Sequence, residues 1–331
     1  MKVRFCLFAV LSLILFFSSN LIAGQDKFEI TVSHDGTGDY TNIQSAIDAC
    51  KAFPDQRIII HIRNGIYNEK VVVPAWNNRI SLIGENSEKT IISYGDYFGK
   101  IYRGRNSTFY TYTFLVEADD FFAENLTFEN SAGPVGQAVA LHVNGNRCVF
   151  RNCRILGNQD TLYTDGPGNR LYFKECYIEG TTDFIFGSAT VLFDDCVVCC
   201  RDNSYITAAS TTKGKRYGYV FMNCRLTAVN GVNKVYLGRP WRDYAKVVFI
   251  NCQLGNHILP EGWSDWEGAE RYKTAFFAEY GNRGSGSNVS KRVNWSHQIS
   301  KKEASKYTIN NILSPELPVE KSVDQWITGK D

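Results

Sequence analysis

The sequence lacks most of the short motifs that mark a familiar catalytic chemistry. It has no G-x-S-x-G elbow, no H-E-x-x-H zinc motif, no phosphate-binding P-loop and no EF-hand calcium loop. Histidine and methionine are scarce, at 5 and 2 residues in a chain of 331. The five histidines are scattered along the chain, so we interpret them as structural, and nothing indicates a Ser-His triad.

Neither sign of charge is in excess. The chain has 36 Lys and Arg against 34 Asp and Glu, a net charge of +2. Two of the positive residues, Lys2 and Arg4, lie in the first 24 residues, which contain no acid, so the two signs balance in the remainder. A near-neutral protein is a poor partner for nucleic acid or an anionic membrane, and we expect neither.

No stretch approaches the ~20 apolar residues that a membrane-spanning helix needs. The apolar run Phe5–Phe17 is shorter, follows the basic start and precedes the small residues Ala23 and Gly24. This order is typical of a secretory signal peptide, with a membrane anchor as the alternative. We expect a signal peptide at residues 1–24, one domain at residues 25–331 and a secreted protein.

Cysteine usage fits an oxidising compartment. Ten cysteines are present, and Cys6 would leave with the signal peptide. Nine remain, so at least one is unpaired or pairs between chains. Cys196 and Cys199 have the C-x-x-C spacing of a zinc site, but no second such pair and no nearby His completes one. Structural thiols or disulfides are the preferred interpretation.

Aromatic residues are abundant, at 14%, and many recur in one strand pattern. The pattern is Phe, two residues, Cys or Asn, and then an apolar residue two positions later. It occurs at residues 122–128, 150–155, 173–178, 193–198, 221–226 and 249–254. One such coil cannot bury its apolar face, but stacked coils can. The sequence therefore predicts an all-β right-handed parallel β-helix, with a β-sandwich as the alternative.

Stacking has consequences for particular residues. Neighbouring coils lie ~4.8 Å apart, so the Phe and Cys positions, with Asn125 in the first repeat, are expected to form ladders. The same spacing permits a disulfide between adjacent coils, and Cys176–Cys196 is the first candidate. We expect short capping helices near both ends. One follows Asn42 and covers a first coil that begins at residue 57, and the other follows the capping box that begins at Ser300.

Four polar segments interrupt the apolar strands. Within them, Asp160 and Asp183 are 23 residues apart, and Gln137 and Gln159 are 22 apart, close to one coil. Stacking would make each pair lateral neighbours, and Arg239 is available as a partner for a buried carboxylate. Taken singly, each Asp is a turn residue and the glutamines are an amide ladder.

Together, two carboxylates and two amides are sufficient for ester hydrolysis without Ser or His. One carboxylate attacks the carbonyl carbon, the other supplies general acid and base, and the amides donate to the oxyanion. Two carboxylates at close range should titrate apart, one ionised and one protonated.

At this point the sequence resembles the pectin methylesterase (pectinesterase) family, in particular its plant members. The resemblance runs from Asp35 to Trp295, most of the mature chain. It includes Gln-Ala-Val-Ala-Leu, Gln-Asp-Thr-Leu-Tyr, Asp-Phe-Ile-Phe-Gly, Leu-Gly-Arg-Pro-Trp and Gly-Trp, at residues 137–141, 159–163, 183–187, 237–241 and 262–263. It implies a right-handed parallel β-helix that hydrolyses methyl esters of homogalacturonan (pectin) to pectate and methanol.

The resemblance also implies residue roles. Asp183 matches the nucleophile and Asp160 the acid/base, and Arg239 matches the residue that orients the nucleophile. Gln137 and Gln159 match the oxyanion donors. The aromatic residues expected to face the sugar are Tyr163, Phe186, Trp241 and Trp263.

Further expectations follow from the family. No cofactor or metal is implied, and the inhibitory N-terminal region of many plant members is expected to be absent. The implied partners are the pectin substrate and a proteinaceous pectinesterase inhibitor, and we expect a monomer in the extracellular cell wall. Four N-x-S/T sequons predict a glycoprotein, at Asn106, Asn125, Asn288 and Asn294.

Two other functions stay open. A polysaccharide lyase or galacturonase uses the same fold, and a glycosidase also needs two carboxylates. However, no acidic cluster suited to calcium is evident in the sequence. A non-catalytic wall-binding protein is the other alternative, and the intact Asp160, Asp183 and Arg239 argue against it. Ala209-Ser210, where the family usually has Gln-Gly, puts loop geometry and substrate preference in question.

Overall fold

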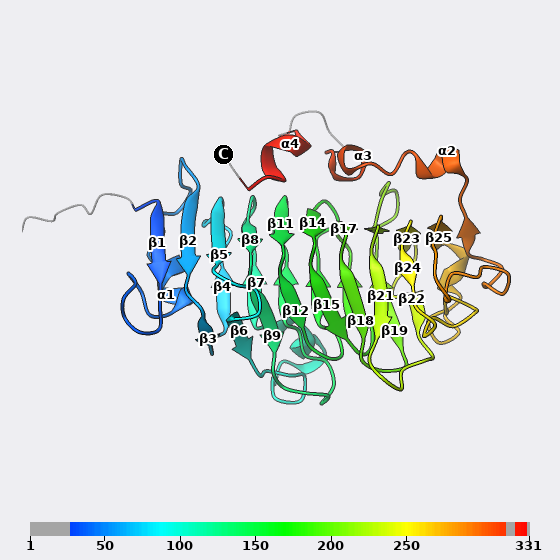
Figure 1. Cartoon of the computed structure of the whole chain (residues 1–331), viewed down its shortest axis with the longest axis horizontal. Coiled ribbons are helices and arrows are strands. Elements are labelled where there is room, and N and C mark those ends of the chain that lie inside the picture. Colours follow the sequence, from blue (N-terminus) through cyan, green and yellow to red (C-terminus); the bar gives the residue numbers. More distant parts are fainter. Residues whose placement is uncertain (1–26, 316–321, 330–331) are drawn as a thin grey trace, which may run out of the picture.

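The computed structural model describes residues 27–315 and 322–329, so the predicted signal peptide lies outside the described residues. Short strands stack one coil on the next along a single axis, and the C-terminal helices run back along one side of the stack (Figure 1). Every strand pair in the described parts of the chain is parallel. The predicted right-handed parallel β-helix is confirmed.

The strands form three sheets, which successive strands visit in turn. Sheet A has 11 strands: β1 (Glu29–Val32), β2 (Ile58–Ile62), β5 (Ile80–Gly84), β8 (Phe122–Glu124), β11 (Cys148–Arg151), β14 (Arg170–Lys174), β17 (Thr190–Asp194), β20 (Tyr219–Met222), β23 (Lys246–Ile250), β25 (Phe276–Tyr280) and β26 (His297–Gln298). Sheet B has 8: β3 (Gly65–Tyr67), β6 (Thr90–Tyr94), β9 (Thr127–Asn130), β12 (Arg154–Leu156), β15 (Tyr177–Gly180), β18 (Val197–Cys200), β21 (Arg225–Ala228) and β24 (Gln253–Leu254). Sheet C has 7: β4 (Val71–Val73), β7 (Phe114–Val116), β10 (Leu141–Val143), β13 (Leu162–Thr164), β16 (Ile185–Gly187), β19 (Tyr205–Ala209) and β22 (Tyr236–Pro240).

A single left-handed residue turns the chain from sheet A into sheet B. Asparagine and aspartate tolerate this conformation better than most residues, which explains the polar residue before each ladder cysteine. The turn residues have φ between 48° and 58°: Asn125, Asn152, Glu175, Asp195, Asn223 and Asn251.

The first repeat is therefore shifted by one residue from the predicted alignment. Asn125 is a turn residue, so its placement in the Cys ladder was wrong. Ala123, and not Phe122, pairs with Phe150, which leaves Leu126 in the position of the cysteines. The interior has room only for a small residue at Ala123, because the rings of Phe121 and Phe128 already pack against Phe150, with centroids 5.7 and 6.0 Å away.

Two ladders fill the interior, as predicted. Successive Phe rings stack with centroid separations of 4.4 to 5.2 Å, at Phe150, Phe173, Phe193, Phe221 and Phe249. Beside them lie the buried thiols of Cys153, Cys176, Cys196, Cys224 and Cys252.

The predicted disulfide was wrong, because all nine cysteines in the described parts of the chain are free. Cys176 Sγ donates to the carbonyl of Phe150 at 3.3 Å, and Cys196 Sγ donates to that of Phe173 at 3.4 Å. Each thiol thus bonds the backbone of the preceding coil instead of the neighbouring sulfur.

Helices cover the ends in part as predicted. Helix α1 (Ile43–Asp48) begins at its N-cap Asn42 and buries Ile43, Ala46 and Ile47 against the first coil, although β1 precedes the strand expected to start it. The Ser300 capping box starts α2 (Lys301–Ala304).

The last two helices do not cap the end of the stack. Helices α3 (Ile309–Leu313) and α4 (Val323–Trp326) lie along the outer face of sheet A (Figure 1). Leu313 and Trp326 pack there on an apolar stripe that includes Tyr172 and Leu192. No helix in residues 27–315 and 322–329 is long and apolar enough to cross a membrane.

The Phe ladder gives a stability prediction. Phe193 is fully buried between Phe173 and Phe221. Phe193→Ala should lower the free energy of unfolding by about 3–5 kcal/mol, because it leaves a cavity in the ladder. Phe98→Ala is the control, since that ring is 38% exposed and should contribute little. Equal losses in chemical unfolding of the two variants would contradict the packing.

Candidate active site

One cavity on sheet C brings most of the predicted site residues together. It has a volume of about 390 Å³. The predicted residues that line it are Gln137, Gln159, Asp160, Asp183, Phe186, Arg239 and Trp241. The residues that sequence reasoning missed are Arg105, Asn106, Thr108, Phe109, Ala208, Arg242 and Trp266.

The two carboxylates occupy equivalent positions one coil apart. Asp160 lies two residues before β13 and Asp183 two residues before β16. Both have left-handed backbones, with φ of 63° and 49°. The amide of Asp160 donates to the Thr182 carbonyl at 3.1 Å, and that of Asp183 to the Tyr205 carbonyl at 2.8 Å. Hydrogen bonds to the next coil thus hold two uncommon conformations beside the cavity.

Arg239 binds Asp183 through two parallel hydrogen bonds. Nε donates to Oδ1 at 3.0 Å and Nη2 donates to Oδ2 at 2.7 Å. The two residues lie two coils apart, on β22 and beside β16. The intervening position is Ala208, which pairs with Phe186 on one side and Arg239 on the other. Its small side chain leaves room for the guanidinium to reach across the intervening coil.

Aromatic rings hold the guanidinium in place. Its carbon lies 4.1 Å from the ring centroid of Tyr205 and 4.0 Å from that of Trp266. Glu267 Oε1 lies 3.6 Å from Nη1 of Arg239. Trp266 was missed by the sequence analysis. Its position three residues after Trp263, which was singled out, is the feature of the sequence that could have indicated it.

The surroundings give the two carboxyl groups different tendencies to ionise. Burial raises the pKa of Asp160 well above its usual range, and the neighbouring charge of Asp183 raises it further. Burial also raises the pKa of Asp183, but the hydrogen bonds and charge of Arg239 oppose that shift. Asp183 is therefore the group that ionises first, and Asp160 is the group that keeps its proton.

The two glutamines are lateral neighbours, as their spacing predicted. Gln137 and Gln159 form a parallel backbone bridge. The Gln159 carbonyl accepts from Ala138 at 3.1 Å, and the Gln137 carbonyl accepts from Phe98 at 2.9 Å. The side-chain amide of Gln137 hydrogen-bonds Asp160. Both glutamines line the cavity, and the contact with Asp160 places the Gln137 side chain beside the carboxyl pair.

Two of the four predicted aromatic residues line the cavity. Phe186 and Trp241 meet there with ring centroids 5.8 Å apart. Tyr163 is not one of the lining residues, and its ring packs 5.1 Å from that of Phe109 and 4.6 Å from that of Phe186. Its expected contact with sugar stays a prediction, and in the structure its ring supports that of Phe186.

Trp263 was placed wrongly. It is 1% exposed and packs in the core, 5.8 Å from Phe249 and 4.7 Å from Phe277. Its backbone pairs with Gly238, the residue before Arg239. Side chains alternate along a strand, so this position faces the interior while Arg239 faces the cavity.

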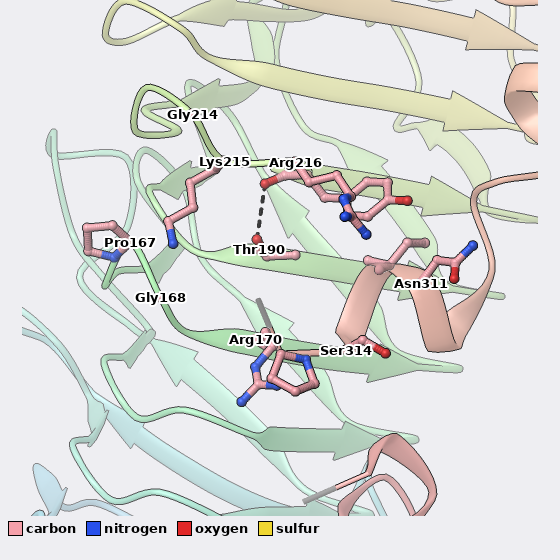
Figure 2. A pocket seen from close by; sticks show the side chains of 12 residues that line it. Pro167, Gly168, Arg170, Thr190, Gly214, Lys215, Arg216, Asn311 and Ser314 are labelled. Atoms are coloured by element: carbon pink, nitrogen blue, oxygen red, sulfur yellow. Dashed lines mark hydrogen bonds between the residues drawn. The ribbon is translucent and has the colours of Figure 1, made fainter. Parts of the chain in front are cut away.

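A second cavity, also of about 390 Å³, lies between the loops beside sheet A and the α3 segment. Figure 2 shows its lining, in which the Thr190 hydroxyl donates to the Tyr217 carbonyl at 3.0 Å. Arg170 donates to the Leu313 carbonyl at its edge. The lining contains no carboxylate and none of the predicted site residues, so the acid–base chemistry belongs to the cavity on sheet C.

The raised pKa of Asp160 has a measurable cost in stability. A buried carboxyl with a raised pKa stabilises the fold below the ordinary aspartate pKa, and this contribution is lost as pH rises through the folded pKa. At pH values above the folded pKa of Asp160, the Asp160→Asn variant should therefore melt at a higher temperature than the native chain. The difference should be roughly 2–4 °C for each unit by which folding raises that pKa. The difference should vanish at acid pH. Melting curves across pH check this, and a difference that grows on acidification would contradict it.

Comparisons with known proteins agree with this geometry. The family model described as Pectinesterase matches residues 29–316. Pectinesterase 31 of Arabidopsis thaliana is 40% identical over 295 residues, which cover 87% of this chain and 92% of that protein. Pectinesterase 5 of the same plant is also 40% identical, over 299 residues and 86% of this chain, but the chain spans only 50% of its length. Three further curated relatives, at 36–37% identity, are matched over only 51–53% of their length, so the chain spans about half of each.

Solved structures share the fold. The pectin methylesterase from carrot superimposes with a TM-score of 0.80 at 34% identity, covering 86% of this chain and 92% of that one. The deglycosylated pectin methylesterase from Aspergillus niger superimposes with a TM-score of 0.77 at 30% identity, covering 90% and 96%. The coil register, the paired carboxylates and these matches lead to one conclusion: the chain belongs to the pectinesterase family.

Proposed function

We propose that the chain is a pectinesterase that hydrolyses methyl esters of homogalacturonan to pectate and methanol. The observation that carries the proposal is the buried carboxyl pair in one cavity, with Arg239 bonded to Asp183 and the pKa of Asp160 raised. This pair supplies an ionised nucleophile and a protonated acid at the same pH. Membership of the family and the lining glutamines support the same chemistry.

In the first half of the reaction, Asp183 attacks the ester. An Oδ atom of its carboxylate bonds to the carbonyl carbon, and negative charge develops on the carbonyl oxygen. The side-chain amides of Gln137 and Gln159 donate to that oxygen. As the tetrahedral intermediate collapses, Asp160 gives its proton to the methoxy oxygen, and methanol leaves. An anhydride between Asp183 and the galacturonate remains.

In the second half, Asp160 is a carboxylate and acts as base. It takes a proton from water as the water oxygen attacks the galacturonate carbonyl. The bond to Asp183 breaks, which restores its carboxylate, and Asp160 again holds one proton. Galacturonate leaves as the free acid group of pectate, so atoms and charges balance without an added cofactor.

Phe186 and Trp241 supply apolar surface to sugar rings bound over the carboxyl pair. Rigid aromatic rings provide contact area while losing little conformational entropy. The small, mostly polar cavity suits one sugar unit of a longer chain that continues on either side. We further propose that the protein is a secreted, glycosylated monomer of the extracellular cell wall and that a proteinaceous pectinesterase inhibitor binds it.

Asp183→Asn tests the nucleophile. A neutral amide is a poor nucleophile of the same shape, so the variant should fold normally and lose nearly all methanol release. Asp202→Asn is the matched control, because Asp202 is exposed away from the cavity and its loss should leave turnover intact. Turnover like that of the native chain in folded Asp183→Asn would remove Asp183 from the reaction.

The products separate this proposal from the alternatives. A lyase would produce unsaturated ends and a galacturonase would produce new reducing ends, whereas a wall-binding protein would release nothing. Methanol without new chain ends is the expected result. Activity lost in EDTA and restored by calcium would favour the lyase.

The glutamines should act on the transition state. Loss of one oxyanion donor typically lowers kcat by about 10²–10³. We expect Gln137→Ala or Gln159→Ala to lower kcat much more than it raises KM. Steady-state kinetics on esterified pectin measures both constants. A change in KM alone would mean that the amides bind substrate or brace the coils without contributing to the chemical step.

A further inference from the structure

Two aromatic rings hold the guanidinium of Arg239, and only one of them belongs to a strand of the stack. Tyr205 is the first residue of β19 in sheet C. Trp266 lies instead in the long connection from β24 to β25. The guanidinium carbon of Arg239 is nevertheless only 4.0 Å from the centroid of its ring. The residues that fix this connection therefore bear on the ion pair between Arg239 and Asp183.

The connection bends sharply after Trp266. Residues 267–270 are exposed. Three of them, Glu267, Gly268 and Glu270, have left-handed backbones, with φ of 48°, 76° and 54°. This conformation is uncommon for residues other than glycine, so the surrounding contacts have to maintain it. The position of Trp266, directly before the bend, therefore depends on the contacts that close and attach this loop.

Hydrogen bonds to the neighbouring coil anchor both ends of the loop. At its start, the amide of Ser264 donates to the Gly238 carbonyl at 3.1 Å. At its end, the hydroxyl oxygen of Thr274 accepts from the amide of Tyr244 at 3.0 Å. Residues 265–273 lie between these two anchors, and they include the bend. Their position over the cavity is set by contacts made within this stretch.

Asp265 closes that stretch on itself. Its Oδ2 accepts from the amide of Glu270 at 2.8 Å, and its Oδ1 accepts from the amide of Tyr272 at 3.3 Å. A carboxylate that accepts two backbone amides joins the start of the loop to the short 3₁₀ helix Arg271–Lys273. These bonds fix the shape of the loop and bring Arg271 to the same side as Trp266.

Arg271 attaches the loop to the segment that lines the cavity. Its Nη1 donates to the carbonyl of Trp241 at 2.6 Å. Its guanidinium carbon lies 5.6 Å from the ring centroid of Trp266, within the range of a cation–π contact. One indole thus contacts two guanidinium groups, those of Arg239 and Arg271. Both tryptophans line the cavity, whereas Arg271 is not one of the lining residues.

A second bond to the same carbonyl does not replace this attachment. The Trp241 carbonyl also accepts from Nη1 of Arg242 at 3.0 Å. Arg242 is the next residue of the same segment, so its bond does not cross to the loop that carries Trp266. Loss of Arg271 would therefore leave the carbonyl with a partner but separate the loop from the cavity segment.

The ionisation of Asp183 is sensitive to how the guanidinium is oriented. Burial raises the pKa of Asp183 and the charge of Glu267 raises it further, whereas the hydrogen bonds and charge of Arg239 lower it. The carboxyl group of Asp160 faces it from the adjacent coil, and Tyr205 contacts the guanidinium with its ring. The other charged lining residues, Arg105 and Arg242, are exposed. Arg239 is thus the group that favours the carboxylate form.

We propose that Arg271 is a positioning residue for the reaction. Through the Trp241 carbonyl and the Trp266 indole, it keeps the guanidinium of Arg239 in the orientation that donates to both oxygens of Asp183. This inference rests on the proposed function and adds to it a residue outside the cavity lining. Without Arg271, the indole of Trp266 can move away, and Arg239 gains freedom that weakens its paired hydrogen bonds.

Steady-state methanol release across pH tests this role. Arg271→Met keeps a long side chain but removes the donors and the charge. We expect kcat to fall roughly tenfold to a hundredfold, as it does when catalytic groups are displaced slightly, with a much smaller rise in KM. The acid limb of kcat/KM should move to higher pH, because Asp183 has to be ionised to attack. Arg271→Lys keeps a charge and a donor and should recover part of both effects.

Lys273→Gln is the matched control. Lys273 lies on the same 3₁₀ helix, its side chain is 58% exposed, and it pairs with Glu270 on the surface. Such exposed pairs contribute little, so this variant should keep the native rate and the native pH profile.

Carbon-13 titration of Asp183 in Arg271→Met adds a readout that needs no turnover. Asp183 should ionise at a higher pH there than in the native chain and in Lys273→Gln. An unchanged titration, a loss confined to KM, or a lower melting temperature with native kinetics would overturn the inference, because Arg271 would then only support the loop. A native chain that releases no methanol from esterified pectin would overturn the proposed function instead, and the titration would still decide the role of Arg271.

Discussion

The paired hydrogen bonds between Arg239 and Asp183 are the interaction on which the site depends. A carboxylate that is only 5% exposed is costly to ionise unless a cation is bonded to it. Arg239 supplies that cation at 2.7 and 3.0 Å. The charge thus retained on Asp183 in turn opposes ionisation of Asp160, so one ion pair biases the protonation of both carboxyl groups.

The coil register makes this pair available. Asp183 and Arg239 are 56 residues apart in the chain. This separation corresponds to two coils, so the stacking of the coils brings the two side chains together. In the coil between them the small Ala208 pairs with Arg239, and the rings of Tyr205 and Trp266 lie against the guanidinium. The interior ladders fix the spacing of the coils and therefore the separation of the charged groups on the outer face. The interior positions repeat the same residue types from coil to coil, whereas the residues on the outer face differ and form the site.

Much of this arrangement could be predicted from the sequence, because a repeat converts sequence spacing into spatial neighbours. The separations of Asp160 from Asp183 and of Gln137 from Gln159 are each close to one coil, and the members of each pair lie in adjacent coils. The predictions failed in the loops, because the sequence does not show which residue of the neighbouring coil a loop residue pairs with. Trp263 was predicted to face the sugar. Its backbone pairs with Gly238, and this register directs its side chain into the core. Arg105 was missed because it lies in a long connection outside the repeat, which no periodicity marks.

Direct titration of the two carboxyl groups is the measurement closest to the central claim. Carbon-13 spectra of labelled aspartates, assigned with Asp160→Asn and Asp183→Asn, would follow each group across pH. The account predicts that Asp183 ionises first and that Asp160 stays protonated to a higher pH. Replacing Arg239 with Gln should remove most of that difference by raising the pKa of Asp183. Two carboxyl groups that ionise together in the ordinary aspartate range would contradict the account.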